Sequence, residues 1–484
     1  MLAVRVSLYT EEEPSPYYPM LFDTPVYFVF LSLVVMVYWR LNHDGQNWML
    51  LCASAFFYGW WDWRFLLLMM GSATMDYLLA QRIADSKDKN IRRSLLVLSL
   101  VLNFGILGFF KYSNFFVQSF ADAFASAGIP ISVHWLNVLL PPGISFYTFQ
   151  EVAYIVDVYQ GKLKPARRFV DYSLFICLFP HLIAGPSQRP SHLLPQVQQP
   201  RHFDGEKFFA GLMLILYGLF RKSVIGDNAA HLSNAAFDGK LGHNAAATLI
   251  GVFAFAIQIY GDFSGYSDMA RGSAQLLGFH FMVNFKQPYL ASSVQDFWRR
   301  WHISLSTWLR DYLYIPLGGN RLGNLRTYGN LMATMLLGGL WHGANWTYVW
   351  WGGLHGFWLA IERFFGGKQD SGSSRFQPVG WIVTMSVVGL SWLLFRARSI
   401  GHAMTMLGDL RFLEWRPQYL PMIGYLSVLA MVMLAIDLRL ESTGEEYPFE
   451  NASPRLAIAS GCALCAVMLL LGPMDSNAFI YFQF

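Results

Sequence analysis

Three histidines lie in apolar, aromatic-rich stretches of the sequence, where an ionisable side chain is unusual. His302, His342 and His355 each have tryptophans within a few positions. Ionisable residues inside membrane segments usually mark functional sites, and histidine, which titrates near neutrality, can act as a general base. The alternative for each is a structural histidine whose ring nitrogens are satisfied by neighbours. For His355 the structural role is favoured, because it lies in a glycine-rich stretch that we interpret as a packed turn.

Residues 296–312 predict one amphipathic helix at a membrane interface. Apolar side chains recur there at helical spacing and form a stripe: Trp298, Trp301, Leu305, Trp308, Leu309 and Tyr312. We expect these tryptophans to lie at the level of the lipid headgroups. His302 falls on this stripe, so its ring requires a hydrogen-bond partner or a cavity.

The residues that follow His342 are candidates for orienting its ring. If the helix continues past His342, Asn345 and Trp346 lie at positions i+3 and i+4 and flank the imidazole. Both side chains carry an N–H group. They are therefore predicted either to orient the ring or to stabilise negative charge that develops during a reaction.

Basic side chains near the histidines are candidates for binding phosphate groups. They are Arg299, Arg300, Arg310 and Arg321. Arg321 ends the glycine-rich turn 316–321. Interfacial arginines also bind lipid headgroups, so this alternative stays open. Asp311 is a secondary candidate of the site, and the sequence predicts no metal site.

The elements that position these residues are predicted to be membrane helices. Of the 484 residues, 54% are hydrophobic and 14% are charged, whereas soluble domains have roughly 25% charged residues. This composition excludes a disordered chain and a coiled coil. The 35 basic and 31 acidic residues nearly balance, which argues against a nucleic-acid binder. The chain is therefore predicted to be an all-α polytopic membrane protein.

Apolar runs long enough to cross a bilayer recur along the chain. The clear candidates are 24–39, 48–61, 64–80, 94–110, 208–225, 246–262, 379–396, 419–437 and 455–472. The weaker segments 140–158 and 170–186 are broken by proline and glycine. Such segments persist in a membrane when protein or a cavity satisfies their backbone, so they predict buried irregular structure. The glycine-rich stretch 331–365 predicts two helices or a re-entrant pair, for about 11 membrane helices in all.

The charge of the loops predicts how the chain is oriented. The loops 81–93 and 161–168 are rich in lysine and arginine, which predicts a cytoplasmic location. The loop 117–137 has one acid and no basic residue and is predicted to be periplasmic. Residues 1–19, polar and proline-containing, are predicted to be a disordered extension. Residues 20–484 then form one transmembrane domain.

Several motifs resemble the membrane-bound O-acyltransferases, and within them the branch that acetylates alginate-type polysaccharides. They include Asp262-Phe-Ser-Gly-Tyr-Ser-Asp268, Trp298-Arg-Arg-Trp-His-Ile-Ser304, Pro316-Leu-Gly-Gly-Asn-Arg321 and Trp341-His-Gly-Ala-Asn-Trp346. Further matches are Leu140-Pro-Pro-Gly-Ile-Ser-Phe146, Phe179-Pro-His-Leu-Ile-Ala-Gly-Pro186 and Asn284-Phe-Lys-Gln-Pro-Tyr289. The resemblance spans about 50–484, with the motifs in the same order, and it implies an acyltransferase core at about 140–365.

The resemblance implies a ring of helices around a central funnel that reaches a buried histidine. His342 takes the place of the family's buried essential histidine, as base or acyl carrier, and His302 takes the place of its second histidine. The implied donor is cytoplasmic acetyl-CoA or an equivalent, used as substrate without a bound cofactor. The implied location is the bacterial inner membrane, where the chain contacts lipids and passes acetyl groups to a periplasmic SGNH-type partner that modifies an exopolysaccharide.

Alginate is the first candidate acceptor and cellulose the next. One rival is a D-alanyl or peptidoglycan O-acyltransferase of the same superfamily. A second rival is a proton-coupled transporter, for which the sequence lacks an internal repeat with charged residues at matching positions.

Overall fold

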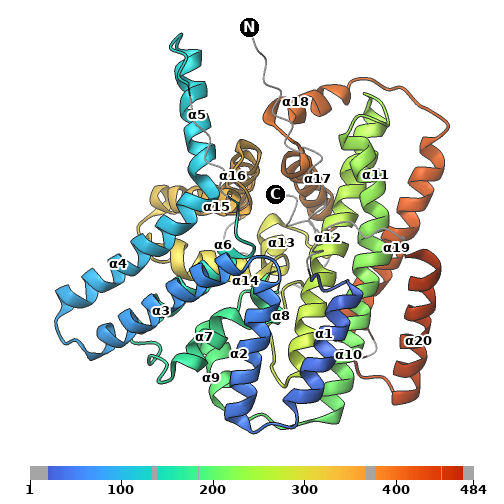
Figure 1. The fold of residues 1–484 in the computed structure, drawn as a ribbon. Coiled ribbons are helices and arrows are strands. Elements are labelled where there is room, and N and C mark those ends of the chain that lie inside the picture. Colours follow the sequence, from blue (N-terminus) through green and yellow to red (C-terminus); the bar gives the residue numbers. More distant parts are fainter. Residues whose placement is uncertain (1–19, 133–138, 184, 367–376, 449, 473–484) are drawn as a thin grey trace.

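The chain is a bundle of helices, seen here in a computed structural model (Figure 1). The structure describes residues 20–132, 139–183, 185–366, 377–448 and 450–472. Within these ranges the regular elements are all helical, and no β-strand occurs. The predicted extension 1–19 lies outside the described residues. The fold class predicted from composition is therefore confirmed, whereas the number of membrane spans stays a prediction.

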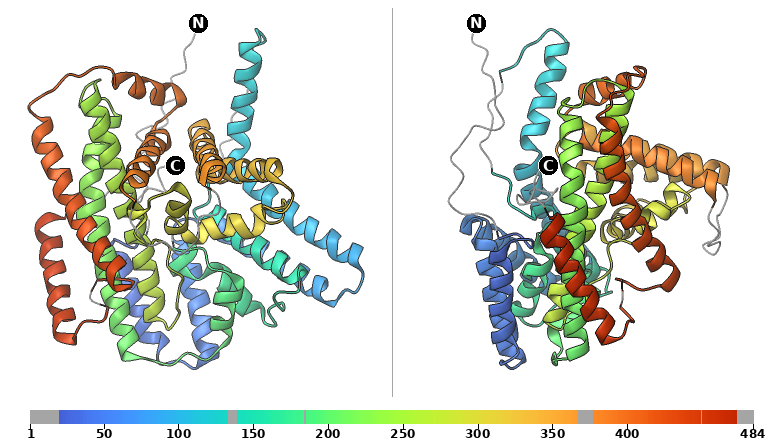
Figure 2. Two further views of the ribbon diagram at one scale, coloured as in Figure 1. Left: turned by 180° about the vertical axis from the view of Figure 1, so that it is seen from behind. Right: turned by 90° about the vertical axis from the view of Figure 1, so that its right-hand side faces the viewer.

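Every clear apolar run coincides with a helix. These helices are α1 (Pro25–Tyr38), α2 (His43–Gly59), α3 (Trp63–Asp85), α4 (Lys89–Leu107), α10 (Gly205–Phe220), α12 (Ala245–Leu276), α17 (Pro378–Arg396), α19 (Tyr419–Thr443) and α20 (Pro454–Leu471). Among the described residues, 6 helices are long and apolar enough to cross a membrane. In Figure 2, α19 and α20 lie along the outer flank of α10 and α12; α19 contacts α12, and α20 contacts α10.

The segments broken by proline and glycine form the protein's interior. They fold into α6 (Ile144–Tyr159), α7 (Phe169–Cys177), α8 (Phe179–Leu182) and α9 (Pro190–Gln198). Nearly all side chains of α6 and α7 are buried. Gly143, just before α6, has φ 70°, and a Cβ there would lie 2.5 Å from the Leu182 carbonyl oxygen. Protein thus surrounds this irregular backbone, as predicted.

Close helix contact at glycines explains part of the Asp262–Asp268 motif. Helix α10 continues through a π-helical turn, η2 (Arg221–Asp227), into α11 (Asn228–Phe237), and this long rod packs along α12. A Cβ on Gly265 of α12 would lie 2.5 Å from the Gly218 carbonyl oxygen, and the reverse also holds. Glycine is required at both positions because the two backbones touch.

The stretch 331–365 forms two packed helices, α15 (Asn324–His342) and α16 (Trp346–Gly366). A Cβ on Gly339 would lie 2.1 Å from the Tyr348 carbonyl oxygen, and one on Gly352 would lie 2.2 Å from the Met335 carbonyl oxygen. These glycines allow the two helices to approach until their backbones touch. The result is a rigid hairpin with His342 at its bend.

The two basic loops lie side by side. Gln81 Nε2 donates to the Ala166 carbonyl at 2.6 Å, and Arg92 donates to the Tyr159 carbonyl at 2.6 Å. In Figure 1, α5 (Ser113–Ser126, cyan) rises on the side away from the loop that joins α3 and α4. The first part of the predicted loop 117–137 is helical, since α5 extends to Ser126. The aromatic residues of this part extend the apolar run of α4. Which side faces the cytoplasm stays a prediction.

Candidate active site

The predicted amphipathic helix 296–312 is broken at His302. The structure has α13 (Val294–Arg300), α14 (Ile303–Leu309) and a π-helical turn, η4 (Arg310–Tyr314). His302 has φ 43°, a left-handed conformation that is rare outside glycine and that often occurs at functional sites. The prediction of one continuous helix was wrong, because tertiary contacts hold the backbone in a turn that helical periodicity does not reveal.

Two tryptophans of the aromatic stripe, Trp301 and Trp308, are buried in protein and do not face lipid. Trp301 is 2% exposed and lies 5.0 Å, centroid to centroid, from both Phe285 and Trp392. Trp308 stacks on Phe149 at 3.7 Å and donates to its carbonyl at 2.9 Å. This part of the prediction was also wrong. The same spacing of tryptophans serves a buried contact, because α6 and α17 cover the stripe.

A short polar network holds the His302 ring. The Asn284 side-chain oxygen lies 3.2 Å from His302 Nδ1 and accepts from the Ser304 hydroxyl at 2.9 Å. The Asn284 amide nitrogen donates to the Ser267 hydroxyl of α12 at 3.1 Å. Since the Asn284 oxygen can only accept, we assign the ring proton to Nδ1, which also lies 3.4 Å from the Ser304 hydroxyl. His302 Nε2 then keeps its lone pair, the form that a general base requires.

His342 is the last residue of α15 and lies in an aromatic enclosure. It is 5% exposed, and its ring makes edge contacts with Trp351 at 5.1 Å and Phe395 at 5.2 Å. The His302 ring lies 6.4 Å from the His342 ring, centroid to centroid. The structure thus brings together two buried histidines that are 40 positions apart in the sequence.

Asn345 and Trp346 do not flank the His342 ring, so that prediction was wrong. Helix α15 ends because Gly343 is fully extended, with φ −167° and ψ 156°. Asn345 instead accepts from the Thr347 amide at 3.0 Å, at the start of α16, and donates to the Arg398 carbonyl at 3.2 Å. Trp346 is 51% exposed and donates to Ser119 of α5 at 3.1 Å. The i+3 rule fails here because the helix stops at the histidine.

His355 lies within helix α16, not in a turn as predicted. The Trp298 indole donates to His355 Nδ1 at 3.3 Å, which assigns the ring proton to Nε2. Trp351 stands between this histidine and His342, at 4.9 Å from the His355 ring. His355 is fully buried, and its Nε2 has no hydrogen-bond partner among the described residues.

The candidate phosphate-binding arginines differ in their surroundings. Arg300 is held by Asp296 at 2.9 Å and by Glu441 at 2.8 Å. Arg310 pairs with Asp311 at 2.7 Å, and Asp311 also receives a bond from Arg189 at 2.9 Å. The other two candidates, Arg299 and Arg321, are exposed. Two of the four candidates, Arg300 and Arg310, thus already pair with carboxylates of this chain.

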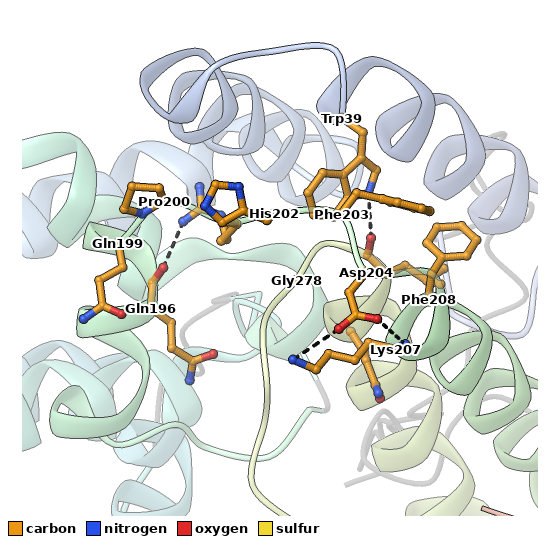
Figure 3. Close-up of a pocket in the computed structure, with 13 residues that line it drawn as sticks. Trp39, Gln196, Gln199, Pro200, His202, Phe203, Asp204, Lys207, Phe208 and Gly278 are labelled. Atoms are coloured by element: carbon orange, nitrogen blue, oxygen red, sulfur yellow. Dashed lines mark hydrogen bonds and ion pairs between the residues drawn. The ribbon is translucent and has the colours of Figure 1, made fainter.

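A cavity of about 610 Å³ lies away from the histidines, at the end of α12. In Figure 3 the aromatic side chains Trp39, Phe203 and Phe208 lie on the same side as Lys207, which is paired with Asp204 at 3.5 Å. The opposite side is formed by Gln196, Gln199 and Pro200. Neither His302 nor His342 lines it. The predicted funnel that reaches His342 is a different feature and stays a prediction.

Comparison with known proteins identifies the family. The chain is 40% identical to a Pseudomonas putida protein named "Probable alginate O-acetylase AlgI", over 96% of this chain and 100% of that one. A family model, "MBOAT, membrane-bound O-acyltransferase family", matches residues 164–400. The chain belongs to the membrane-bound O-acyltransferase family. It is accordingly an acyltransferase enzyme and a multi-pass membrane protein.

Two further relatives, whose names state other activities, have lower identity to the chain. The peptidoglycan O-acetyltransferase of Helicobacter pylori is 36% identical over 80% of this chain and 79% of its own length. The teichoic acid D-alanyltransferase of Bacillus subtilis is 28% identical over 47% of this chain and 60% of its own length. The D-alanyl alternative is therefore not favoured.

Two residues at the site, Asn284 and Lys111, were not predicted from the sequence to be functional. Asn284, which orients His302, was part of a matching motif but received no role. Lys111 donates to the Trp341 carbonyl at 2.5 Å, next to His342, from a position outside the matched residues 164–400. The sequence could have indicated Lys111, because this lone cation directly follows the apolar run 94–110, where a charge is unusual.

Proposed function

We propose that this chain is the membrane subunit of a bacterial exopolysaccharide O-acetylation system. In this proposal it takes acetyl groups from a cytoplasmic thioester, acetyl-CoA or an equivalent, and passes them across the inner membrane. A periplasmic SGNH-type acetyltransferase then places them on the polymer. Alginate is the proposed polymer, and cellulose is the next candidate. The observation that carries the proposal is the pair of buried histidine rings, 6.4 Å apart, with His342 at the bend of the α15–α16 hairpin and His302 in the turn between α13 and α14.

The proposed chemistry is acyl transfer from sulfur to oxygen. A histidine accepts the proton of the attacking hydroxyl group while the hydroxyl oxygen bonds to the acetyl carbon. The carbon–sulfur bond then breaks, and the histidine returns the proton to the departing thiolate. His342 is the proposed base or transient acyl carrier, and His302, with its proton fixed on Nδ1 by Asn284, supports it. Aromatic rings around His342 exclude water, which would otherwise hydrolyse the thioester.

The direct test measures acetate on extracellular polymer purified from a strain that lacks this chain. We expect the acetate to disappear while polymer export continues, and to return when the wild-type chain is supplied. Supplying the His342→Ala variant at the same membrane level should not restore it. Acetate unchanged with polymer export lost would instead support a transporter.

The proposed orientation has its own test. In a cysteine-free background, single cysteines at positions 89 and 122 are labelled in intact cells with a membrane-impermeant maleimide. The basic loop predicts that position 89 is protected and that position 122 reacts. Labelling at position 89 would contradict a cytoplasmic donor side at this end of the molecule.

A further inference from the structure

A lysine outside the recognised motifs contacts the helix end that carries His342. Lys111 lies in η1 (Gly108–Tyr112), a π-helical turn between α4 and α5. Such a turn inserts an extra residue into a helix and changes which side chains face a neighbour. It occurs often at functional sites, so this position raises the question of what the turn presents to α15.

Two consecutive residues of η1 bind the last turn of α15. Lys111 Nζ donates to the Trp341 carbonyl at 2.5 Å and to the Ser145 hydroxyl at 3.1 Å. Tyr112 donates through its hydroxyl to the Leu340 carbonyl at 2.9 Å. The last four carbonyls of a helix have no partner within that helix. The π turn therefore caps α15 from another part of the chain, directly before His342.

The half-buried Lys111 has different partners from the buried Lys222. Lys222 is paired with two carboxylates, Asp227 at 2.6 Å and Asp262 at 3.0 Å. Among the described residues, by contrast, no carboxylate forms an ion pair with Lys111, whose hydrogen-bond acceptors are neutral oxygens. A cation is stabilised at a helix C-terminus by the helix dipole, and its bond to a carbonyl is stronger than a neutral one. A lysine thus suits this cap better than a neutral donor would.

We propose that Lys111 is a positioning residue for His342. Its charge-assisted bond fixes the rotation of the last turn of α15, and that rotation sets where the His342 ring stands relative to His302. The Trp341 ring belongs to the same arrangement, because it lies 5.9 Å from the His302 ring and 5.1 Å from the His342 ring. This inference rests on the proposed role of His342 in acyl transfer.

The kinetic test uses Lys111→Met, which keeps the length of the side chain and removes its charge and donors. A small misplacement of a reacting group can cost about 10²-fold in rate, so we expect kcat to fall by ~10- to 100-fold. KM for the acetyl donor should change little. Lys111→Arg should recover part of the rate, since it keeps a charged donor. Ser145→Ala is the matched control, because it removes the other partner of Nζ and leaves the bond to Trp341; its kcat should stay near wild type.

A second readout does not depend on the reaction. Diethyl pyrocarbonate modifies histidine, and peptide mass spectrometry gives the rate for His342 alone. We expect this rate to change several-fold in Lys111→Met and to stay unchanged in Ser145→Ala. If the wild-type protein transfers no acetyl group, the proposed function fails, while the labelling rates still test Lys111.

Two results would overturn the inference. One is a Lys111→Met protein with kcat and His342 labelling both at the wild-type level. The other is a uniform loss of folded protein in Lys111→Met and Lys111→Arg, with the remaining folded fraction fully active, which would show a purely structural lysine. A lower kcat with altered His342 labelling, in membranes holding normal amounts of protein, supports it.

Discussion

Two buried polar regions of this protein, both inside the helix bundle, are built in opposite ways. The first is the histidine site, His302 and His342, whose neighbours are aromatic rings and neutral hydrogen-bond partners. The second is the charged contact between η2 and α12, which comprises Arg221, Lys222, Asp227, Asp262 and Asp268. In the charged contact every cation lies within ion-pair distance of a carboxylate.

The difference shows that charge inside a membrane protein does not by itself locate the chemistry. Removing ions from water costs several kcal/mol each, and close pairing offsets that cost. The charged contact meets this requirement internally, beside the Gly218–Gly265 backbone contact, and so joins two helices. The histidine site instead surrounds its two rings with aromatic side chains and neutral hydrogen-bond partners, an environment that suits the proposed role of a proton acceptor.

The largest expected effect is on activity at the histidine site. His342→Ala should leave a folded, inserted protein and essentially abolish acetylation, because loss of a general base typically costs ~10²–10⁴ in rate. Polymer-bound acetate is measured at equal membrane levels of the two proteins. Near wild-type acetylation in His342→Ala, together with an inactive His355→Ala, would contradict this assignment. The reacting histidine would then be His355.

The matching change in the charged contact should act on stability. Lys222→Met leaves Asp227 and Asp262 buried without their cation, which typically costs ~3–5 kcal/mol. We expect a lower yield and a lower unfolding midpoint in detergent, with normal specific activity in the folded fraction. Lys207→Met, which replaces an exposed lysine on α10, is the control and should leave the midpoint unchanged. A stable but inactive Lys222→Met protein would show that the charged contact takes part in chemistry.

His302→Ala should impair transfer less than His342→Ala does. The loss has two sources, a missing base and a relaxed left-handed turn, and misplacement alone can cost about 10²-fold. Asn284→Ala separates them, because it keeps the imidazole and removes the nearer of the two partners of Nδ1. If the oriented ring matters, Asn284→Ala should lower kcat and shift the pH profile of kcat. An unchanged profile in Asn284→Ala would leave His302 with a packing role.

The smallest effect is expected at His355. Its described hydrogen bond is a neutral one from Trp298, and loss of such a bond typically costs about 1 kcal/mol, or roughly fivefold. His355→Ala should therefore lower acetylation by less than about tenfold, and His355→Gln should lower it less. Acetylation by both His355 variants is measured beside His342→Ala at equal membrane levels, and the losses are compared. Equal losses of acetylation in His355→Ala and His342→Ala would show that the reactive site includes His355, on the far side of Trp351.

The sequence by itself determined the membrane class, the positions of the helices and the residues worth testing. Apolar runs such as 379–396 matched helices almost to the residue, because the cost of exposing backbone in lipid leaves few alternatives. The glycine pairs and buried middle segments were also predictable, since proline and glycine in a membrane require a protein environment. His302 and His342 were found from their unusual place in aromatic, apolar stretches.

Only the tertiary structure decided how these residues meet. The periodicity of 296–312 is the same whether its tryptophans face lipid or protein, so it could not reveal the turn at His302. The end of α15 at His342 depends on an extended Gly343, and the cap on that end comes from Lys111, more than 200 positions away. Local patterns carry no information on such contacts, because they arise when distant segments compete to satisfy the same buried groups.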